Sequence, residues 1–405
     1  MVRHPRTALC GIVLCTLLGP GCSEEPDVER QDQKGSAVTV LDVPGATPDL
    51  PTWKLSEAPT LVLGDGSDGD PTFHRLGHLR RLEDGSLMVA DRGDARILLY
   101  GPSGRFIRAL GGMGFGPGEF RTISGMVPVE DGAVVVFDGG ARRLTTMTLD
   151  GEVVATHSVA TDGDFSHPLA GYGLEGRLHG GDLVLIPDAI PVEPDGGTGS
   201  FRVEAPALLL DRQGRSLDSL GDIWGMEAFA DERATSLVPM GWRRLATLHP
   251  EGLLSADASA GRIELIGQRG RVERLILLAR DPVPIPSGVR NAWLEQRTSR
   301  ASDPSMAQEL RRWLEQIPFP EHLPHFEALK VAPDGHIWLQ DVSLPGHEEP
   351  RRWMVLSMEG EVVAQVMVPA NLRVEQITSD EILGVWTDSL GVQTVRGYRI
   401  TRQDG

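Results

Sequence analysis

The sequence predicts an all-β protein built from repeated four-stranded antiparallel units. Shifting the chain by 47 positions brings Gly64 onto Gly111 and Phe73 onto Phe120. The register then holds without a gap as far as Gly151. A repeat period in the forties that contains four short strands is typical of the blades of a β-propeller.

Each unit contains the same four expected strands, which we name a, b, c and d in chain order. In the first unit, GSLMVAD follows a Glu-Asp-Gly turn and predicts strand b. The stretch RILLYGPSGRFIRALG then predicts strands c and d, joined by a tight glycine turn. The apolar run before Glu-Asp-Gly supplies strand a. The second unit repeats all four parts.

The later units follow the same plan and close the ring. We expect them within residues 181–221, 250–278, 331–368 and 382–401. The sixth unit ends after its strand c, and the segment APTLVLG (58–64) lies where its missing strand d would come from. The sequence therefore predicts a six-bladed β-propeller, closed by pairing of N- and C-terminal strands, which leaves no sheet edge open.

Two stretches resemble a known repeat family. RLEDGSLMVADRGDARILLYGPSGR and GFGPGEF, the latter followed by GAVVVFDGGARRL, are similar to the NHL-type repeat of six-bladed β-propellers. The resemblance covers residues 64–151 and is weaker in the middle units. It implies the propeller fold and little else, because propellers host many unrelated functions.

The N-terminal residues predict export and a lipid anchor. Basic residues precede a short apolar run, 7–18, and a small residue precedes Cys22, as in a bacterial lipoprotein signal. We expect a signal peptide over 1–21, lipid on Cys22, a flexible tether over 22–51 and the propeller over 52–405. The protein would then lie in the cell envelope, on its periplasmic or cell-surface side. The alternative is ordinary secretion, with Cys22 incidental.

Cysteine use and charge exclude several classes of protein. All three cysteines lie at or before position 22, so the mature domain cannot form a structural disulfide or a thiolate metal site. The net charge of −18 argues against a nucleic-acid partner, because no basic stripe offsets phosphate repulsion. We expect a monomer that contacts the membrane through its lipid. Its ligand would be an envelope protein, a peptide or a small molecule.

The lengths of the connections differ between the two faces of the expected ring. The a–b and c–d turns, which share one face, are terse sequences such as EDG, PSG and LDG. Long connections fall on the opposite face, where b–c loops and d-to-a connections emerge. They span residues 161–172, 189–204, 222–241, 281–325 and 342–351. Binding usually involves such unrepeated loops on a rigid scaffold, so we expect one functional face.

The longest connection predicts a helical insertion over about 286–317. Asp303 and Pro304 are the residue types expected at the N-cap and first turn of its second helix. Met306, Leu310, Trp313, Leu314 and Ile317 recur at helical spacing on one side. This stripe predicts packing onto the propeller; the alternative is a lid over the central opening.

Candidate metal and catalytic motifs are weak. His322 and His325 are separated by Leu323-Pro324, which prevents a regular helix from aligning two imidazoles on a metal. Asp65, Asp68 and Asp70 offer oxygen ligands for Ca²⁺, but their spacing does not match a calcium loop and fits a solvated turn. No nucleophile-elbow motif is present.

Two functional hypotheses follow. The first is a binding or scaffold module that acts through the face with long loops, and the second is a hydrolase or lyase with a divalent metal at the central opening. The absence of a recognisable catalytic set favours the first. By position alone, we expect these residues near the mouth of the ring: Asp70, Phe115, Glu119, Trp242, Arg243, His325 and Glu327.

Overall fold

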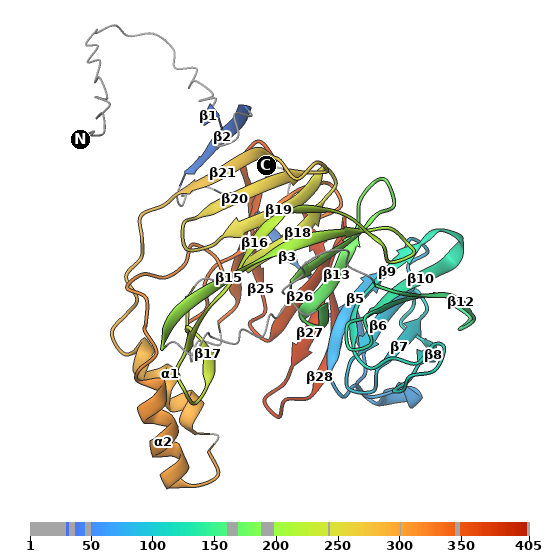
Figure 1. The fold of residues 1–405 in the computed structure, drawn as a ribbon, viewed down its shortest axis with the longest axis horizontal. Coiled ribbons are helices and arrows are strands. Elements are labelled where there is room, and N and C mark those ends of the chain that lie inside the picture. The colour runs from blue at the N-terminus through green and yellow to red at the C-terminus, as the bar shows by residue number, and fades with distance from the viewer. Residues whose placement is uncertain are drawn as a thin grey trace, which may run out of the picture.

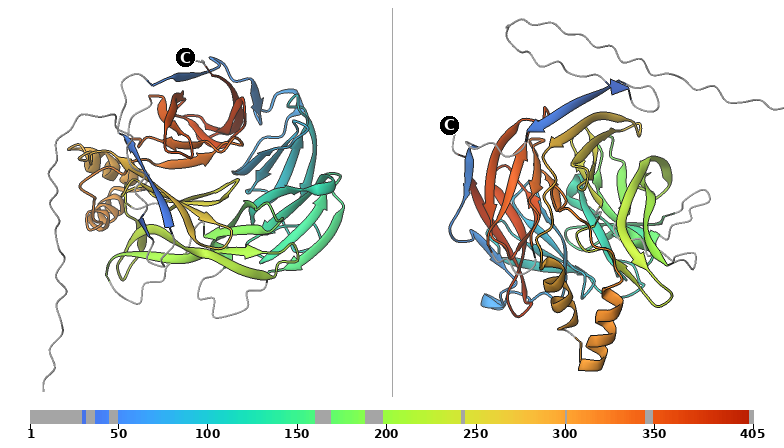
Figure 2. Two further views of the ribbon diagram at one scale, coloured as in Figure 1. Left: turned by 90° about the horizontal axis from the view of Figure 1, so that it is seen from above. Right: turned by 90° about the vertical axis from the view of Figure 1, so that its left-hand side faces the viewer.

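The structure is a six-bladed β-propeller with a small helical insertion, as the sequence predicts (Figures 1 and 2). It is a computed structural model, which describes residues 30–31, 37–44, 50–159, 169–187, 198–241, 244–299, 301–344 and 349–402. Seen from above in Figure 2, the blades follow one another around a central axis.

Each blade is a four-stranded antiparallel sheet whose strands follow one another in sequence, from the inner strand a to the outer strand d. Blade 1 consists of β5 (Leu76–Arg81), β6 (Leu87–Asp91), β7 (Arg96–Tyr100) and β8 (Phe106–Gly111). Blade 2 consists of β9 (Ile123–Val129), β10 (Ala133–Asp138), β11 (Arg143–Thr148) and β12 (Val153–Ser158). Blade 3 consists of β13 (Tyr172–Arg177), β14 (Leu183–Pro187), β15 (Gly199–Leu210) and β16 (Ser216–Ala230), with β17 (Thr235–Leu237) added beside β16.

The remaining blades have the same order. Blade 4 consists of β18 (Arg244–His249), β19 (Gly252–Asp257), β20 (Arg262–Gly267) and β21 (Val272–Ala279). Blade 5 consists of β22 (Ala328–Val331), β23 (Ile337–Gln340), β24 (Arg351–Leu356) and β25 (Val362–Val368). Blade 6 consists of β26 (Leu372–Ile377), β27 (Glu381–Thr387), β28 (Gln393–Thr401) and, from the other end of the chain, β4 (Leu61–Leu63).

The predicted closure of the ring is confirmed by β4. This strand pairs antiparallel with β28, with Leu63 opposite Val395. Leu63 and Val395 are both fully buried, in an apolar cluster shared by blades 6 and 1. A further N-terminal strand, β3 (Thr52–Leu55), pairs with both β25 and β28 and so links blades 5 and 6. The pairing of β4 with β28 therefore joins the last blade to the first.

Part of the segment 22–51, which the sequence predicts to be a flexible tether, is drawn as strand in the structure. β2 (Ala37–Pro44) pairs parallel with β21 along the outside of blade 4. The short β1 (Arg30–Gln31) pairs with β2.

The repeated aspartate at the end of strand b is structural. The carboxylate of Asp138, fully buried, accepts hydrogen bonds from the backbone N–H groups of Arg121 (2.9 Å), Thr122 (3.0 Å) and Ala141 (3.0 Å). Asp91 does the same one unit earlier, accepting from Arg75 N at 3.0 Å. A buried carboxylate with several N–H donors ties the d-to-a connection to the b–c loop and satisfies donors that water cannot reach.

The repeated glycine and phenylalanine form a second structural pair. Gly111 has φ of 79°, and a Cβ built on it would lie 2.5 Å from the ring of Phe120. Gly64 has φ of 82° and meets Phe73 in the same way. Only glycine accepts this backbone conformation and this contact, so the pair marks where one blade ends and the next begins.

The helical insertion packs against an arm of blade 3. Helix α1 spans Val289–Thr298 and α2 spans Pro304–Leu314, with Asp303 capping α2 through Ser305 N and Met306 N, both at 2.9 Å. The helices lie beside β17 at the edge of the ring (Figure 1). One apolar cluster joins the insertion to blade 3; its buried members are Phe229, Val238, Trp293, Leu294, Leu314 and Ile317.

Most of the predicted stripe on α2 takes part in this packing. Leu314 and Ile317 are buried, while Leu310 and Trp313 pack partly against the cluster. Met306, at the start of the helix, is 52% exposed. In the part of the chain that the structure describes, no helix has the length and apolar character needed to cross a bilayer.

Candidate functional site

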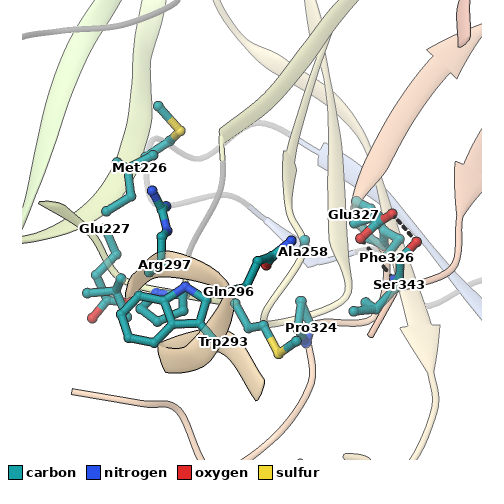
Figure 3. A pocket seen from close by; sticks show the side chains of 16 residues that line it. Met226, Glu227, Ala258, Trp293, Gln296, Arg297, Pro324, Phe326, Glu327 and Ser343 are labelled. Carbon is teal, nitrogen blue, oxygen red and sulfur yellow. Dashed lines mark hydrogen bonds between the residues drawn. The ribbon is translucent and has the colours of Figure 1, made fainter. Parts of the chain in front are cut away.

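A cavity of about 450 Å³ lies between α1 and the propeller, and we call it the rim cavity (Figure 3). Three of the long connections expected from the sequence meet there: 222–241, 281–325 and 342–351. Ala258, at the start of the b–c loop of blade 4, contributes to the wall as well. All of these segments emerge on the face that carries the b–c and d-to-a connections.

The walls of the rim cavity combine apolar and polar groups. Trp293 of α1 and Phe326 supply aromatic rings, 8% and 1% exposed. Gln296 and Arg297, on the same helix, are exposed and offer hydrogen-bond donors. Figure 3 shows Met226 and Glu227 on one side and Glu327 on the other. An enclosed apolar space with a few convergent polar groups is the usual form of a small-molecule site.

One wall residue has an unusual backbone. Three described residues other than glycine have positive φ: Ala95, Arg142 and Met240. Ala95 and Arg142 occupy equivalent positions in the repeat, 47 residues apart, so their conformation belongs to the b–c turn of the blade. Met240, with φ of 54°, has no such explanation and lines the rim cavity. Such conformations are costly and gather at functional sites.

Glu327, one of the residues expected near the mouth, lines the rim cavity. Its carboxylate accepts hydrogen bonds from Ser343 N at 2.9 Å and Ser343 Oγ at 2.6 Å, and from the amide of Gln340. Arg351 lies 3.5 Å away as an ion-pair partner. These contacts hold the carboxylate rigidly, so Glu327 orders the wall of the cavity.

His325 lies in a smaller neighbouring cavity of about 220 Å³, together with Arg280, Asp341 and Arg352. Asp341 pairs with Arg352 at 2.6 Å and with Arg280 at 3.7 Å. Burial lowers the pKa of His325, and the positive charge of Arg280 lowers it further. His325 is therefore a neutral imidazole at pH 7.

The expected residues in the first two units lie apart from the rim cavity. Asp70 accepts a hydrogen bond from the backbone N–H of Gly64, within its own loop. Glu119 accepts from Gly116 N at 2.8 Å, also within its loop. Phe115 is 73% exposed, with the guanidinium of Arg121 4.9 Å from the centre of its ring. None of these three lines the rim cavity.

Three other expected residues belong to parts of the chain that the structure does not describe. Cys22, Trp242 and Arg243 lie outside the described residues. Met240 and Gly241, just before Trp242, do line the rim cavity. Sequence reasoning missed Trp293, Gln296 and Arg297, although the helical insertion that carries them was predicted.

One group of three potential metal ligands occurs among the described residues: His74, Asp91 and Asp94. The carboxylate of Asp91 is already used by backbone N–H groups, and Arg96 pairs with Asp91 at 3.3 Å and with Asp94 at 2.8 Å. His74 Nδ1 lies 2.7 Å from Asp94, whose hydrogen bond and charge raise the pKa of His74. Arg96 therefore pairs with both carboxylates and supplies the positive charge that a metal ion would otherwise supply.

The aspartate loop 65–70, which the sequence offered as a weak calcium site, has carboxylates that hydrogen-bond within the loop itself. Asp65 accepts from Ser67 N at 2.9 Å and Ser67 Oγ at 2.6 Å, which lowers the pKa of Asp65. Asp70 contacts Gly64, and the side chain of Asp68 lies outside the described set. Asp65 and Asp70 act as turn-forming residues of their loop.

The axis of the ring contains a second space of about 680 Å³, which we call the central channel. The inner strands of five blades line it: β5, β13, β18, β22 and β26. Five of its side chains are cationic: Arg80, Arg92, Arg177, Lys330 and Arg373. Its two carboxylates are Glu175 and Glu375. No described residue of the helical insertion lines this channel.

Comparisons with known proteins support the fold. No family model matches the sequence, and no curated protein matches it. A solved structure named "Putative exported protein", from Bacteroides fragilis, is similar with a TM-score of 0.50 at 10% identity, over 90% of this chain and 100% of that one. A member of the DUF4221 family from Bacteroides vulgatus has a TM-score of 0.51 at 9% identity, over 88% and 100% of the two chains.

A third similar structure is an enzyme. Virginiamycin B lyase from Staphylococcus aureus has a TM-score of 0.39 at 10% identity, over 86% of this chain and 99% of that one. The TM-scores of the first two structures show a shared β-propeller fold, and at identities of 9–10% they show the fold alone. The lyase has a lower TM-score and carries no argument about activity.

Proposed function

We propose that this protein is an exported β-propeller that acts as a binding module, with the rim cavity as its ligand site. One observation carries the proposal: three long, unrepeated connections on one face of the ring converge on a single cavity. The a–b and c–d turns on the opposite face are short in the described blades. A rigid scaffold with variable loops gathered at one end is a common arrangement for binding.

The lining indicates the chemistry of the ligand. Trp293, Phe326 and Met226 offer apolar surface, so the ligand needs an apolar body. The carboxylate of Glu327 is already hydrogen-bonded by Ser343 and Gln340. Gln296 and Arg297 make no side-chain hydrogen bond or ion pair to any described residue, so their N–H groups are available to an acceptor or an anion. We expect a small molecule or a peptide side chain with an apolar body and an acidic group.

The test uses anilinonaphthalene sulfonate, a fluorescent probe with an aromatic body and one anionic group. The wild-type protein is expected to bind one molecule, with fluorescence enhancement and energy transfer from Trp293. Arg297→Gln is expected to weaken binding at least about tenfold, because a hydrogen bond to a charged group contributes about 1.5–3 kcal/mol.

The matched control is Arg312→Gln. Arg297 and Arg312 each lie in the last turn of a helix of the insertion, but only Arg297 lines the rim cavity. The control is expected to bind the probe like the wild type. The proposal is wrong if both variants bind equally, or if the probe does not bind the wild type at a single site.

The proposal includes the cellular placement suggested by the N-terminal residues. We infer that the chain is an NHL-type propeller and a lipoprotein, anchored through Cys22 as a monomer in the bacterial cell envelope. Cys22→Ala is expected to move the protein from the membrane to the soluble fraction. Unchanged fractionation would mean that Cys22 carries no lipid.

The alternative, a hydrolase or lyase with a divalent metal at the central opening, is less well supported. The described residues lining the central channel carry five cationic side chains and two carboxylates. Glu375 pairs with Arg373, and Glu175 accepts from Thr247 Oγ1 at 2.8 Å. A divalent cation there would face like charge and occupied carboxylates, so this lining does not fit such a metal.

A further inference from the structure

The central channel has a charge opposite to that of the protein as a whole. Its described lining carries three more positive than negative side chains, whereas the chain has a net charge of −18. Four of the five cations come from three blades: Arg80 and Arg92 from blade 1, Lys330 from blade 5 and Arg373 from blade 6. Blades 5, 6 and 1 are consecutive around the ring, so these groups share one side of the channel.

Only part of this positive charge is neutralised by the protein. Arg177 pairs with Glu130, and Arg373 pairs with Glu375. Arg80 donates to two carbonyl oxygens, those of Leu79 at 3.2 Å and Glu175 at 3.1 Å, which carry no formal charge. Lys330 makes no hydrogen bond or ion pair to any residue that the structure describes. No ion pair among the described residues therefore neutralises the charges of Arg80 and Lys330.

A glycine makes room for one of these cations. A Cβ built on Gly77 would lie 2.4 Å from Cδ of Arg92 and 2.6 Å from its Cγ. The backbone of Gly77 is not in the left-handed region, so its conformation does not require glycine. The missing side chain instead lets Arg92 extend along the channel wall. Any larger residue at position 77 would push Arg92 away.

The environment of His78 shows how closely the cations converge. Burial, and after it the charges of Arg80, Arg92, Lys330 and Arg373, together lower the pKa of His78 to about 3. Four cations therefore act on a single imidazole at the channel wall. The imidazole is neutral at pH 7 and can donate one hydrogen bond and accept another.

We propose that the central channel is a second binding site, for a small oxyanion that carries two or more negative charges, such as a phosphate ester or a polycarboxylate. Like charges lining a cavity repel one another and strengthen the attraction for an anion inside it. Guanidinium groups match the oxygen spacing of carboxylate and phosphate. The volume suits a small molecule, and the acidic exterior disfavours a polyanionic chain.

The test is isothermal titration calorimetry of the mature protein with pyrophosphate and, separately, with citrate. Lys330→Gln is expected to weaken binding about tenfold or more, as for loss of a charge-assisted hydrogen bond. Lys54→Gln is the matched control, because Lys54 is an exposed lysine on β3 outside the channel. Its binding is expected to match the wild type.

A second variant, Gly77→Ala, keeps every charge and displaces Arg92. It is expected to weaken anion binding while leaving the thermal midpoint close to that of the wild type. Tighter binding of pyrophosphate would assign phosphate compounds as the ligand class, and tighter binding of citrate would assign polycarboxylates. The proposal is overturned if neither anion binds the wild type below about 1 mM. It is also overturned if Lys54→Gln weakens binding as much as Lys330→Gln.

Discussion

The rim cavity and the central channel share one scaffold but are built from different parts of the sequence. The rim cavity is walled mainly by connections that have no counterpart in the other blades, among them α1 and the arm of β16 and β17. The channel is lined mainly by the inner strands, which every blade contains. One site is formed mainly by the connections between strands, whereas the other is formed mainly by the inner strands of the repeat.

The two spaces also differ in chemistry. Aromatic and aliphatic side chains dominate the rim cavity, with Arg297 and Gln296 at its edge. Charged side chains dominate the channel. A ring that is closed by buried strands can hold both, because the apolar clusters between blades fix the inner strands independently of the loops. The comparison implies that variants can be found that damage one site and spare the other.

The largest effect is expected from opening the ring, which should damage both sites together. Leu63→Ala removes a fully buried side chain of β4 from the cluster between blades 6 and 1. We expect a loss of about 2–5 kcal/mol in the free energy of unfolding, measured by urea denaturation. Val62→Ala, on the same strand at a position that is 37% exposed, should change it by less than about 0.5 kcal/mol. Equal effects would contradict closure by β4.

A smaller and local effect is expected from the helical insertion. Leu294→Ala removes a side chain that is 2% exposed from the cluster joining α1 to blade 3. We expect loss of anilinonaphthalene sulfonate binding with pyrophosphate binding retained, because no described residue of the insertion lines the channel. Met306→Ala, at an exposed position of α2, should leave both unchanged. Loss of pyrophosphate binding in Leu294→Ala would show that the two sites are coupled.

The smallest effect is a pH dependence that belongs to the channel. Because the folded state lowers the pKa of His78 from 6.5 to about 3, its contribution to stability is present above pH 6.5 and is lost as the pH falls toward 3. Thermal midpoints should therefore fall less between pH 7 and pH 4 in His78→Gln than in the wild type. Glu175 and Glu375 are common to both proteins, so the difference isolates His78. Parallel pH profiles would contradict a half-buried imidazole surrounded by cations.

Much of the fold could be predicted from the sequence, because the residues that recur in the repeat are those that the backbone geometry of a blade requires. Glycine and phenylalanine recur at the blade junctions since a Cβ at Gly111 would collide with Phe120. Aspartate recurs since Asp138 must bond three backbone N–H groups. The sixth unit lacks a strand d in the sequence, which predicted that residues 58–64 supply it, and β4 lies within that segment. Loop lengths likewise indicated the face on which the rim cavity lies.

The channel could not be predicted in the same way, because its residues depart from the repeat. Arg80, Lys330 and Arg373 occupy inner strands of different blades, and each alone looks like an ordinary polar residue of a strand. Their convergence appears only when the ring closes. Asp70 and Glu119 were expected near the mouth of the ring by position alone, yet each hydrogen-bonds within its own loop. The net charge of the predicted inner strands, summed over all blades, is the feature of the sequence that could have indicated a cationic channel.

The independence of the two sites is tested most directly by titrating anilinonaphthalene sulfonate into the wild-type protein with and without saturating pyrophosphate. The sulfonate group makes this a stringent test, since the probe is itself an anion that the channel could attract. We expect one probe site in both titrations, with the same affinity. Displacement of the probe by pyrophosphate would contradict the account, because both molecules would then occupy the same space.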